Sequence, residues 1–231
     1  MRIYSETVPV QYEEGRTHFC GMDILVDERV FIPRPETELV VSTVIDLCQK
    51  KSLKDPFILD VCTGSGAISI ALAKHVPSSR VIAVDISEDA LQVARANAVR
   101  AGVEKSITFF RSDMFGALCP DYKGMFDAVV SNPPYVSAGD YQKADAWVKA
   151  EPEIALLAGD EGMDHLNILA EESGDFLKAG GFLAVEIGYD QSEKVKRAFL
   201  SAGYENISPH KDFNGYERVI TGEKPQRKEI Y

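Results

Sequence analysis

The sequence lacks several features that would assign it to a common class of protein. It contains only 4 cysteines and 4 histidines among 231 residues. The cysteines form no Cys-x-x-Cys pair and the histidines no cluster at metal-ligand spacing, so we predict neither a metal site nor a disulfide framework. No run of 18 apolar residues occurs, and the first residues lack the apolar stretch of a secretory signal. We therefore expect reduced thiols, a cytoplasmic protein and no membrane association.

Positive charge is also scarce. The chain has 25 lysines and arginines against 36 aspartates and glutamates, a formal net charge of −11. Proteins whose affinity depends on neutralising many phosphates usually carry a basic face. The charge therefore favours a protein or small-molecule substrate over nucleic acid. Hydrophobic residues make up 45% of the chain, enough for the core of one large α/β domain, which we expect to be a monomer.

Apolar runs typical of buried strands alternate with segments of helical periodicity. Strands are predicted at 57–61, 81–85, 107–111, 126–131, 182–187, 204–208 and 217–221. Helices are predicted from Pro35 and at 67–74, 88–101, 163–178 and 192–201, and residues 136–160 are predicted to form a long loop with short helical pieces. This alternation indicates a mostly parallel seven-stranded sheet with helices on both faces.

Local signals place several boundaries. Alternation in 22–26 and 29–32 predicts a hairpin around a turn at Asp27-Glu28. Ser87 is predicted to cap a helix that Gly102 ends, and Gly180-Gly181 to stop the helix before them. We divide the chain into an N-terminal hairpin segment (1–34), a catalytic domain (35–222) and a polar tail (223–231).

A glycine-containing loop follows the first predicted strand of the sheet. It reads Asp60-Val61-Cys62-Thr63-Gly64-Ser65-Gly66. The glycines allow a tight turn and close approach of a ligand to the backbone. Asp85 ends the next strand, where a carboxylate can accept hydrogen bonds from a ribose diol. A dinucleotide fingerprint requires a third glycine where Ser69 stands, and acidic residues such as Asp60 suit a cationic cofactor better than a pyrophosphate. S-adenosylmethionine is favoured, while a nicotinamide cofactor and a purely structural turn stay open.

Ser112-Asp113-Met114 follows the third strand. Asp113 could accept a hydrogen bond from the adenine amino group of the cofactor, and Met114 could cover the adenine ring. An ordinary loop explains these residues equally well.

Asn132-Pro133-Pro134-Tyr135 follows the fourth strand. The prolines fix φ and lack N–H groups, which holds their carbonyls outward. Asn132 adds a side-chain acceptor, and Tyr135 offers a flat face. These residues predict a rigid acceptor pair, from Asn132 and the Pro133 carbonyl, that binds a planar NH₂ group and directs its nitrogen toward a methyl donor. The alternatives are a turn that ends a strand and a non-catalytic cofactor-binding module.

Three segments together resemble the PrmC/HemK family of release-factor glutamine methyltransferases. They are Phe31-Ile32-Pro33-Arg34-Pro35-Glu36-Thr37-Glu38, the stretch from Ile58 to Gly66, and Val130-Ser131-Asn132-Pro133-Pro134-Tyr135. Further agreement comes from Glu151-Pro152 and from Glu186-x-Gly188. The Asn-Pro-Pro-Tyr step is shared with methyltransferases that act on amino groups of nucleic acids, so methylation of a base remains an alternative.

The resemblance implies a Rossmann-like class I fold and methylation of the glutamine in the Gly-Gly-Gln loop of class 1 release factors, with S-adenosylhomocysteine as the second product. It implies cofactor contacts at 62–66, Asp85, Met114 and Asn132, and glutamine contacts at 132–135. Family members usually carry a helical domain ahead of the hairpin, whereas this sequence begins at the hairpin. Cys62 stands where glycine is common in the family and Met114 where an aromatic residue is common.

Overall fold

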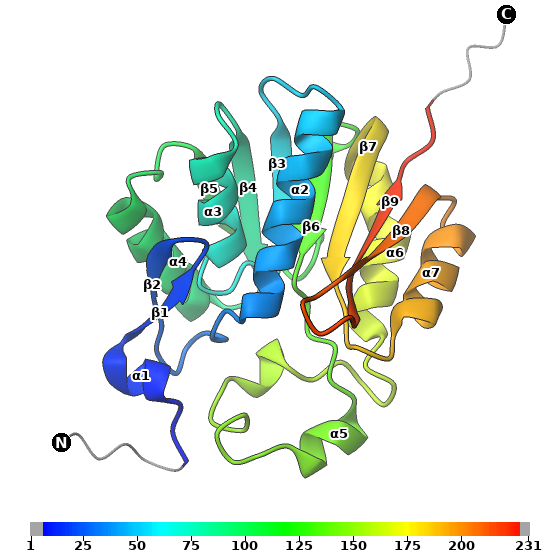
Figure 1. Cartoon of the computed structure of the whole chain (residues 1–231). Helices are drawn as coiled ribbons and strands as arrows, with labels where there is room; N and C mark the ends of the chain where they lie inside the picture. The colour runs from blue at the N-terminus through cyan, green and yellow to red at the C-terminus, as the bar shows by residue number, and fades with distance from the viewer. Residues whose placement is uncertain (1–6, 227–231) are drawn as a thin grey trace, which may run out of the picture.

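A seven-stranded sheet forms the centre of the computed structural model, which describes residues 7–226 (Figure 1). Its strands are β3 (Phe57–Val61), β4 (Arg80–Asp85), β5 (Ile107–Arg111), β6 (Phe126–Ser131), β7 (Leu177–Glu186), β8 (Glu205–Lys211) and β9 (Glu217–Glu223). Their order across the sheet is β5-β4-β3-β6-β7-β9-β8. The strands from β5 to β7 are parallel, and β9 is antiparallel to both of its neighbours. The predicted mostly parallel sheet is confirmed.

Helices cover both faces of this sheet. One face packs against α2 (Glu38–Lys50), α3 (Ala67–His75) and α4 (Glu88–Ala101), and the other against α6 (Asp164–Phe176) and α7 (Ser192–Ser201). Every residue of β3 is buried, which explains why this strand is an uninterrupted apolar run apart from Asp60. The predicted caps of α4 are confirmed: the Ser87 hydroxyl accepts the Ala90 N–H at 3.1 Å, and Gly102 has φ 70°.

The shorter elements lie at the ends of these layers. Among the described residues the first elements are α1 (Val10–Glu14), which was not predicted, and a separate hairpin of β1 (Arg16–Phe19) and β2 (Met22–Leu25). The single turns are η1 (Pro35–Thr37), η2 (Pro120–Tyr122) and η3 (Glu153–Ala155). The predicted loop at 136–160 contains α5 (Ala138–Lys143) and η3, which confirms its short helical pieces.

The N-terminal hairpin exists and the strand predicted at 22–26 is confirmed as β2, but the second strand, predicted at 29–32, and the position of the hairpin turn were wrong. The turn falls at Cys20-Gly21, where φ is 47° and 77°, and two successive positive φ values fit the twist of a two-residue hairpin. Val30 and Ile32 are 1% exposed, yet their segment is not a strand. The Ile32 N–H is bonded at 2.9 Å to the Glu151 carboxylate and not to a neighbouring strand. Their alternation reflects burial alone.

The role predicted for Gly180-Gly181 was also wrong, because these glycines lie inside β7. Helix α6 ends at Phe176 and the strand begins at the next residue. The Gly180 N–H donates to the Lys224 carbonyl at 2.9 Å, and the Lys224 N–H donates to the Gly181 carbonyl at 2.8 Å. The start of the predicted polar tail is therefore bonded to the sheet through Glu223 in β9 and Lys224. Residues 227–231 of that tail lie outside the described residues.

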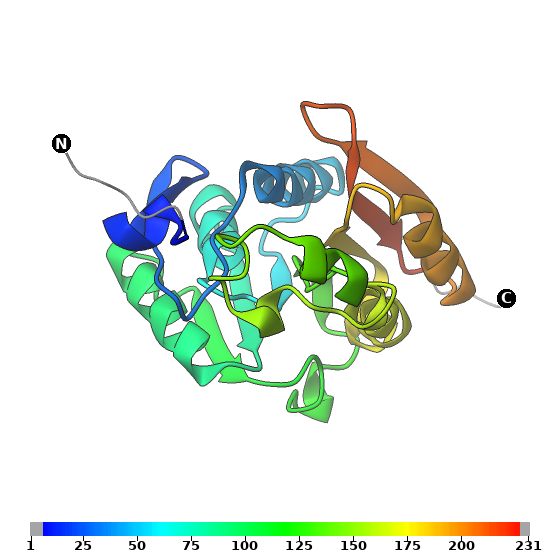
Figure 2. The same cartoon turned by 90° about the horizontal axis from the view of Figure 1, so that it is seen from below.

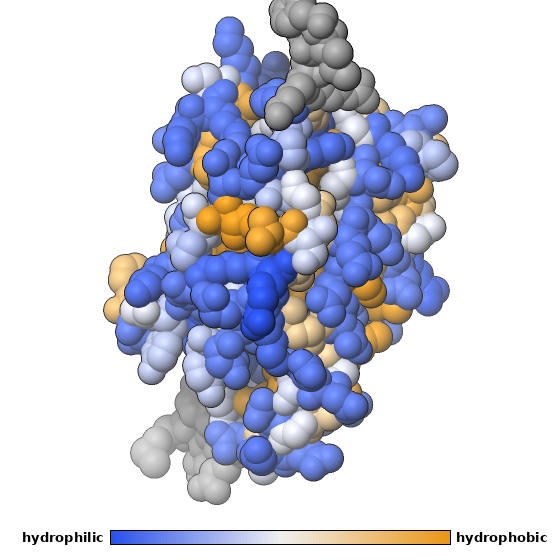
Figure 3. Space-filling view, turned by 90° about the vertical axis from the view of Figure 1, so that its right-hand side faces the viewer, coloured by the Kyte–Doolittle hydropathy of each residue, from blue (hydrophilic) through white to orange (hydrophobic). Residues whose placement is uncertain are grey.

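The carboxyl ends of the parallel strands share one edge of the sheet, at the bottom of Figure 1. Seen from that side in Figure 2, the loop that carries α5 crosses over this edge beside the N-terminal segment. Figure 3 shows the side of the molecule formed by α7 and β8, which is mostly hydrophilic with small separate hydrophobic patches, and Leu200 of α7 is exposed. Within residues 7–226, no helix has both the length and the apolar character needed to cross a bilayer.

Candidate active site

A cavity lies at the shared edge of the sheet, and most of the predicted site residues line it. It includes Cys62, Thr63, Gly64, Ser65, Asp85, Asp113, Met114, Asn132, Pro133, Pro134 and Tyr135. Segments far away in sequence complete its wall, including 29–31, Pro33 and 154–156. Two predicted residues, Asp60 and Gly66, do not line it. The four strand ends therefore meet at one site, as the sequence predicted.

The glycine loop has positive φ at three positions, and at one of them it packs closely against a helix. Cys62, Gly64 and Gly66 have φ values of 61°, 55° and 81°. A Cβ atom on Gly66 would lie 3.0 Å from the Cβ of Ala94 in α4, so this glycine allows the loop to touch that helix. Cys62 adopts the left-handed region that favours glycine, and its Sγ lies 3.8 Å from the Met114 Sδ.

Asp60 lies behind the loop. Its Oδ2 accepts hydrogen bonds from the hydroxyls of Thr63 at 2.7 Å and Ser69 at 2.6 Å. Its Oδ1 is buried without a hydrogen-bond partner in the described part of the chain. Burial raises the pKa of Asp60 to about 6, although both hydroxyls lower it. Asp60 thus holds the loop in place through one carboxyl oxygen, while its other oxygen is buried and unpaired.

Asp85 at the end of β4 supports the same loop from the cavity side. Its Oδ2 accepts the Gly64 N–H at 2.8 Å and its Oδ1 accepts the Ser87 N–H at 2.9 Å. Burial raises the pKa of this carboxyl, while the backbone N–H groups lower it. Each carboxylate oxygen has two acceptor positions, so Asp85 can still accept from a ligand.

The Asn-Pro-Pro-Tyr segment presents a defined set of acceptors. The Asn132 Nδ2 donates to the Thr37 hydroxyl at 3.1 Å, which leaves its Oδ1 as the free end of the amide. No hydrogen bond to the Pro133 carbonyl forms within residues 7–226. The Tyr135 hydroxyl points inward and donates to the Glu186 Oε1 at 2.9 Å, so its ring lines the cavity. Two unpaired oxygens and one aromatic ring therefore border the site.

Glu186 is a buried carboxyl that the sequence analysis did not assign to the site. It ends β7 and is 1% exposed. Burial raises its pKa to about 7, opposed by the hydroxyls of Thr37 and Tyr135. The other carboxyl oxygen, Oε2, is buried and has no hydrogen-bond partner among the described residues. The signal in the sequence was a lone charge at the end of an apolar strand.

An ion pair joins the two segments that cover the cavity. The Arg34 guanidinium contacts the Glu151 carboxylate, whose side chain is fully buried. The same guanidinium lies 5.0 Å from the Phe31 ring centroid and 5.4 Å from that of Trp147. Because Glu151 also accepts the Ile32 N–H, the segment before α2 and the α5 loop are tied together over the site.

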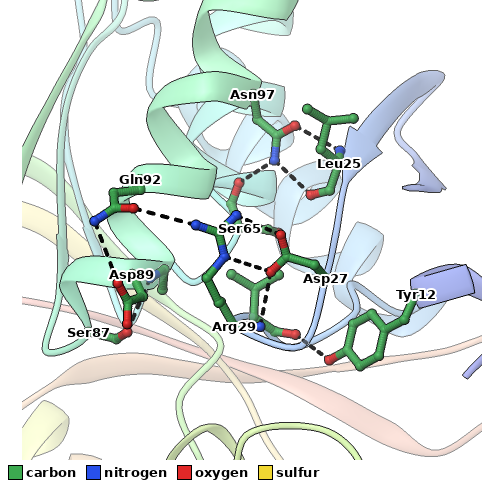
Figure 4. Close-up of polar contacts among 11 residues, drawn as sticks. Tyr12, Leu25, Asp27, Arg29, Ser65, Ser87, Asp89, Gln92 and Asn97 are labelled. Atoms are coloured by element: carbon green, nitrogen blue, oxygen red, sulfur yellow. Dashed lines mark hydrogen bonds and ion pairs between the residues drawn. The ribbon is translucent and has the colours of Figure 1, made fainter. Parts of the chain in front are cut away.

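Asn97 of α4 ties the N-terminal hairpin to the glycine loop (Figure 4). Its Nδ2 donates to the Leu25 carbonyl at 3.0 Å and to the Ser65 carbonyl at 2.9 Å, and its Oδ1 accepts the Leu25 N–H at 2.7 Å. Asn97 is 2% exposed. In the same view Arg29, which lines the cavity, is paired with Asp27 and reaches Gln92 of α4. No sequence motif indicated a role for Asn97, because its partners are backbone groups distant in the chain.

Comparison with known proteins agrees with this geometry. A family model described as a methyltransferase domain matches residues 58–149. A release factor glutamine methyltransferase of Koribacter versatilis is 41% identical over 218 residues, which cover 94% of this chain and 75% of that protein. One from Fusobacterium nucleatum is 37% identical, over 96% of this chain and 62% of its own length.

Solved structures show the same fold. A methyltransferase from Pyrococcus furiosus superposes with a TM-score of 0.64 at 19% identity, covering 89% of this chain and 90% of that chain. A protein-(glutamine-N5) methyltransferase (release factor-specific) from Alicyclobacillus acidocaldarius gives a TM-score of 0.51 at 25% identity, covering 84% of this chain and 94% of that chain. With these relatives and this arrangement of its strand ends, the chain belongs to the release factor glutamine methyltransferase family.

Proposed function

We propose that this protein transfers a methyl group from S-adenosylmethionine to the side-chain amide nitrogen of a glutamine, in the Gly-Gly-Gln loop of a class 1 release factor. The observation that carries the proposal is the orientation of Asn132. Its NH₂ end is occupied by Thr37, so its Oδ1 and the Pro133 carbonyl offer two acceptors to a planar NH₂ group in the cavity.

The residues around the glycine loop fit the cofactor. The carboxylate of Asp85 retains acceptor capacity for a ribose diol, and Asp60 supports the loop from behind through the hydroxyls of Thr63 and Ser69. We assign Asp113 and Met114 to the adenine and residues 62–65 to the rest of the cofactor, with Gly66 shaping the loop through its contact with α4. When bound, S-adenosylmethionine supplies an electrophilic methyl group on a sulfonium.

The chain's own groups supply positioning. An amide nitrogen is a poor nucleophile because its lone pair is delocalised into the carbonyl. Acceptors for both of its N–H groups, at Asn132 and Pro133, hold the nitrogen in one orientation and favour tetrahedral geometry as its new bond forms. Such positioning of two reactants contributes up to roughly 7–11 kcal/mol to a reaction. The Tyr135 ring and Pro134 pack against the flat amide, and Arg34–Glu151 holds the cover that excludes water.

We further propose that the chain acts as a monomer in the cytoplasm, where release factors work in translation. In this proposal the catalytic domain spans 35–222. The N-terminal hairpin segment takes part in docking the protein substrate, because its Arg29, Val30, Phe31 and Pro33 line the cavity.

The test is transfer of isotope from labelled S-adenosylmethionine. We expect label in a class 1 release factor, mapped by mass spectrometry to the glutamine of the Gly-Gly-Gln loop, and none in a variant with alanine at that glutamine. Label found only in DNA or RNA would overturn the proposal in favour of base methylation. Tight cofactor binding without transfer to any acceptor would instead identify a non-catalytic binding module.

A further inference from the structure

We propose that Thr37 and Glu186 are positioning residues that set which end of the Asn132 side-chain amide faces the substrate. They do so through a buried chain of hydrogen-bonding groups that runs from Asn132 through Thr37 to Glu186, with Tyr135 joining from the other side. The inference rests on the proposed function and deepens it.

The four groups come from three distant parts of the sequence and meet behind the acceptor pocket. Asn132 and Tyr135 follow β6, Thr37 ends η1, and Glu186 ends β7. Thr37 is 3% exposed and Glu186 is 1% exposed. Two hydrogen bonds link these groups: the Asn132 Nδ2 donates to the Thr37 Oγ1 at 3.1 Å, and the Tyr135 hydroxyl donates to the Glu186 Oε1 at 2.9 Å.

The direction of these bonds follows from what each group can donate. A hydroxyl has one hydrogen, and Thr37 already uses its oxygen to accept from Asn132. Its hydrogen is then available to the Glu186 carboxyl, which has a buried oxygen without a partner and whose pKa the Thr37 hydroxyl lowers. A carboxylate accepts and does not donate. Glu186 therefore orients both hydroxyls toward itself.

This direction determines the acceptor presented to the substrate. With its hydrogen turned to Glu186, Thr37 can only accept from Asn132, so the NH₂ end of Asn132 faces inward and Oδ1 faces the cavity. The opposite amide orientation would place an NH₂ group against the substrate NH₂, where both are donors. A reversed Asn132 amide would therefore fail to hold the substrate nitrogen in position for transfer, and it would leave the glycine loop undisturbed.

The charge of Glu186 determines whether the hydrogen bonds from Asn132 through Thr37 to Glu186 keep this direction. Four groups influence the charge of this carboxyl: Thr37 and Glu36 of η1, Tyr135 after β6, and Arg218 of β9. Burial raises the pKa of Glu186 to about 7, and Glu36 also raises it. The two hydroxyls, of Thr37 and Tyr135, and the positive charge of Arg218 lower it. Once protonated, Glu186 can donate to Thr37 and so permit the reversed chain. The rate of transfer should therefore fall as the pH falls through about 7.

The experiment compares four variants on the intact chain with a release factor as acceptor. Thr37→Val keeps the shape but removes the hydroxyl, Thr37→Ser restores the hydroxyl, and Glu186→Gln removes the charge. Thr43→Val is the matched control, a buried threonine on the adjoining helix α2. The readouts are kcat, KM, cofactor Kd, the pH profile of kcat and the melting temperature.

We expect Thr37→Val to lower kcat by about 100-fold, as a loss of positioning does, with cofactor Kd within about twofold of the wild type. Thr37→Ser should recover most of that rate, and Thr43→Val should leave it unchanged. Glu186→Gln should lower kcat by about tenfold, in keeping with loss of bonds to a charged group, and flatten the pH profile near 7. A normal kcat in Thr37→Val, or an unchanged pH profile in Glu186→Gln, would overturn the inference.

Two further arms separate this inference from the proposed function and from misfolding. If the wild type methylates a nucleic-acid amino group instead, the proposed function fails. The same four variants, measured with that acceptor, still test the hydrogen bonds from Asn132 through Thr37 to Glu186. Independently of turnover, hydrogen exchange of the Asn132 side-chain amide followed by NMR should be faster in Thr37→Val than in Thr43→Val. Equal exchange in the two folded variants would contradict the Asn132–Thr37 link.

Discussion

Two glycines of the cofactor loop allow a controlled perturbation, because they share a backbone conformation but differ in their surroundings. Gly64 and Gly66 have φ values of 55° and 81°, so alanine at either position must adopt the left-handed region. Nothing lies within 4 Å of a Cβ atom on Gly64. A Cβ atom on Gly66 would lie 3.0 Å from Ala94 Cβ, 3.2 Å from Ile70 Cδ1 and 3.3 Å from Ala94 Cα.

The expected loss of stability follows from these contacts. The left-handed conformation costs a residue with a Cβ atom roughly 1–2 kcal/mol, and this is the whole cost expected for Gly64→Ala. Gly66→Ala adds overpacking against helix α4, whose backbone is part of the contact, at about 1–3 kcal/mol. Gly66→Ala should therefore lower the free energy of unfolding by about 1–3 kcal/mol more than Gly64→Ala.

The two substitutions should affect ligand binding in the opposite order. Gly64 lines the cavity and Gly66 does not, so Gly64→Ala should weaken cofactor binding more than its small stability cost would suggest. Urea unfolding of both variants gives the stabilities, and isothermal titration with S-adenosylmethionine gives the affinities. Equal losses of stability in the two variants, or a larger loss in Gly64→Ala, would refute the packing argument.

Three further substitutions test the other parts of the site. Asn132→Ala should lower kcat by about 10²–10³, the usual effect of losing one group that stabilises a transition state, while titration shows a cofactor Kd close to that of the wild type; near-normal turnover would contradict the acceptor pair. Asn97→Ala leaves buried backbone groups of β2 and the glycine loop unpaired and should lower the free energy of unfolding by about 3 kcal/mol. The exposed Asn167→Ala in α6 should change it little, and similar urea midpoints for the two would argue against the link. In the folded protein the pKa of Asp60 is raised to about 6 from 3.8. Its contribution to the free energy of unfolding is therefore fully present below about pH 4 and is lost as the pH rises to about 6. At 1.36 kcal/mol per pKa unit this loss is about 3 kcal/mol. Asp60→Asn should abolish that part of the pH dependence of urea unfolding, and an unchanged slope would show that Asp60 is not its source.

Much of the fold could be predicted because its signals are local. The strands 57–61, 107–111 and 126–131 were predicted with the bounds that the structure has. The central strands β3 and β6 are largely apolar because both faces of the sheet are covered there. The caps at Ser87 and Gly102 depend only on their own helix. The convergence of loop 62–66, Asp85 and 132–135 follows from parallel strands ending at one edge.

Other features depended on contacts that no local pattern encodes. Val30 and Ile32 alternate like a strand, but they are buried against other segments and the real turn lies at Cys20-Gly21. Gly180 and Gly181 look like a helix stop, yet Lys224 pairs with them across β7.

The sequence alone determined the family, the sheet and the strand-end residues that border the cavity, because each of these depends on residues near one another in the chain. Only the tertiary structure showed that Thr37, Glu186 and Asn97 support the site. Their partners lie 95, 51 and 72 residues away. A polar side chain buried among apolar neighbours is stable only when such a partner is present, and the identity of that partner is fixed by the packing of the sheet and its helices.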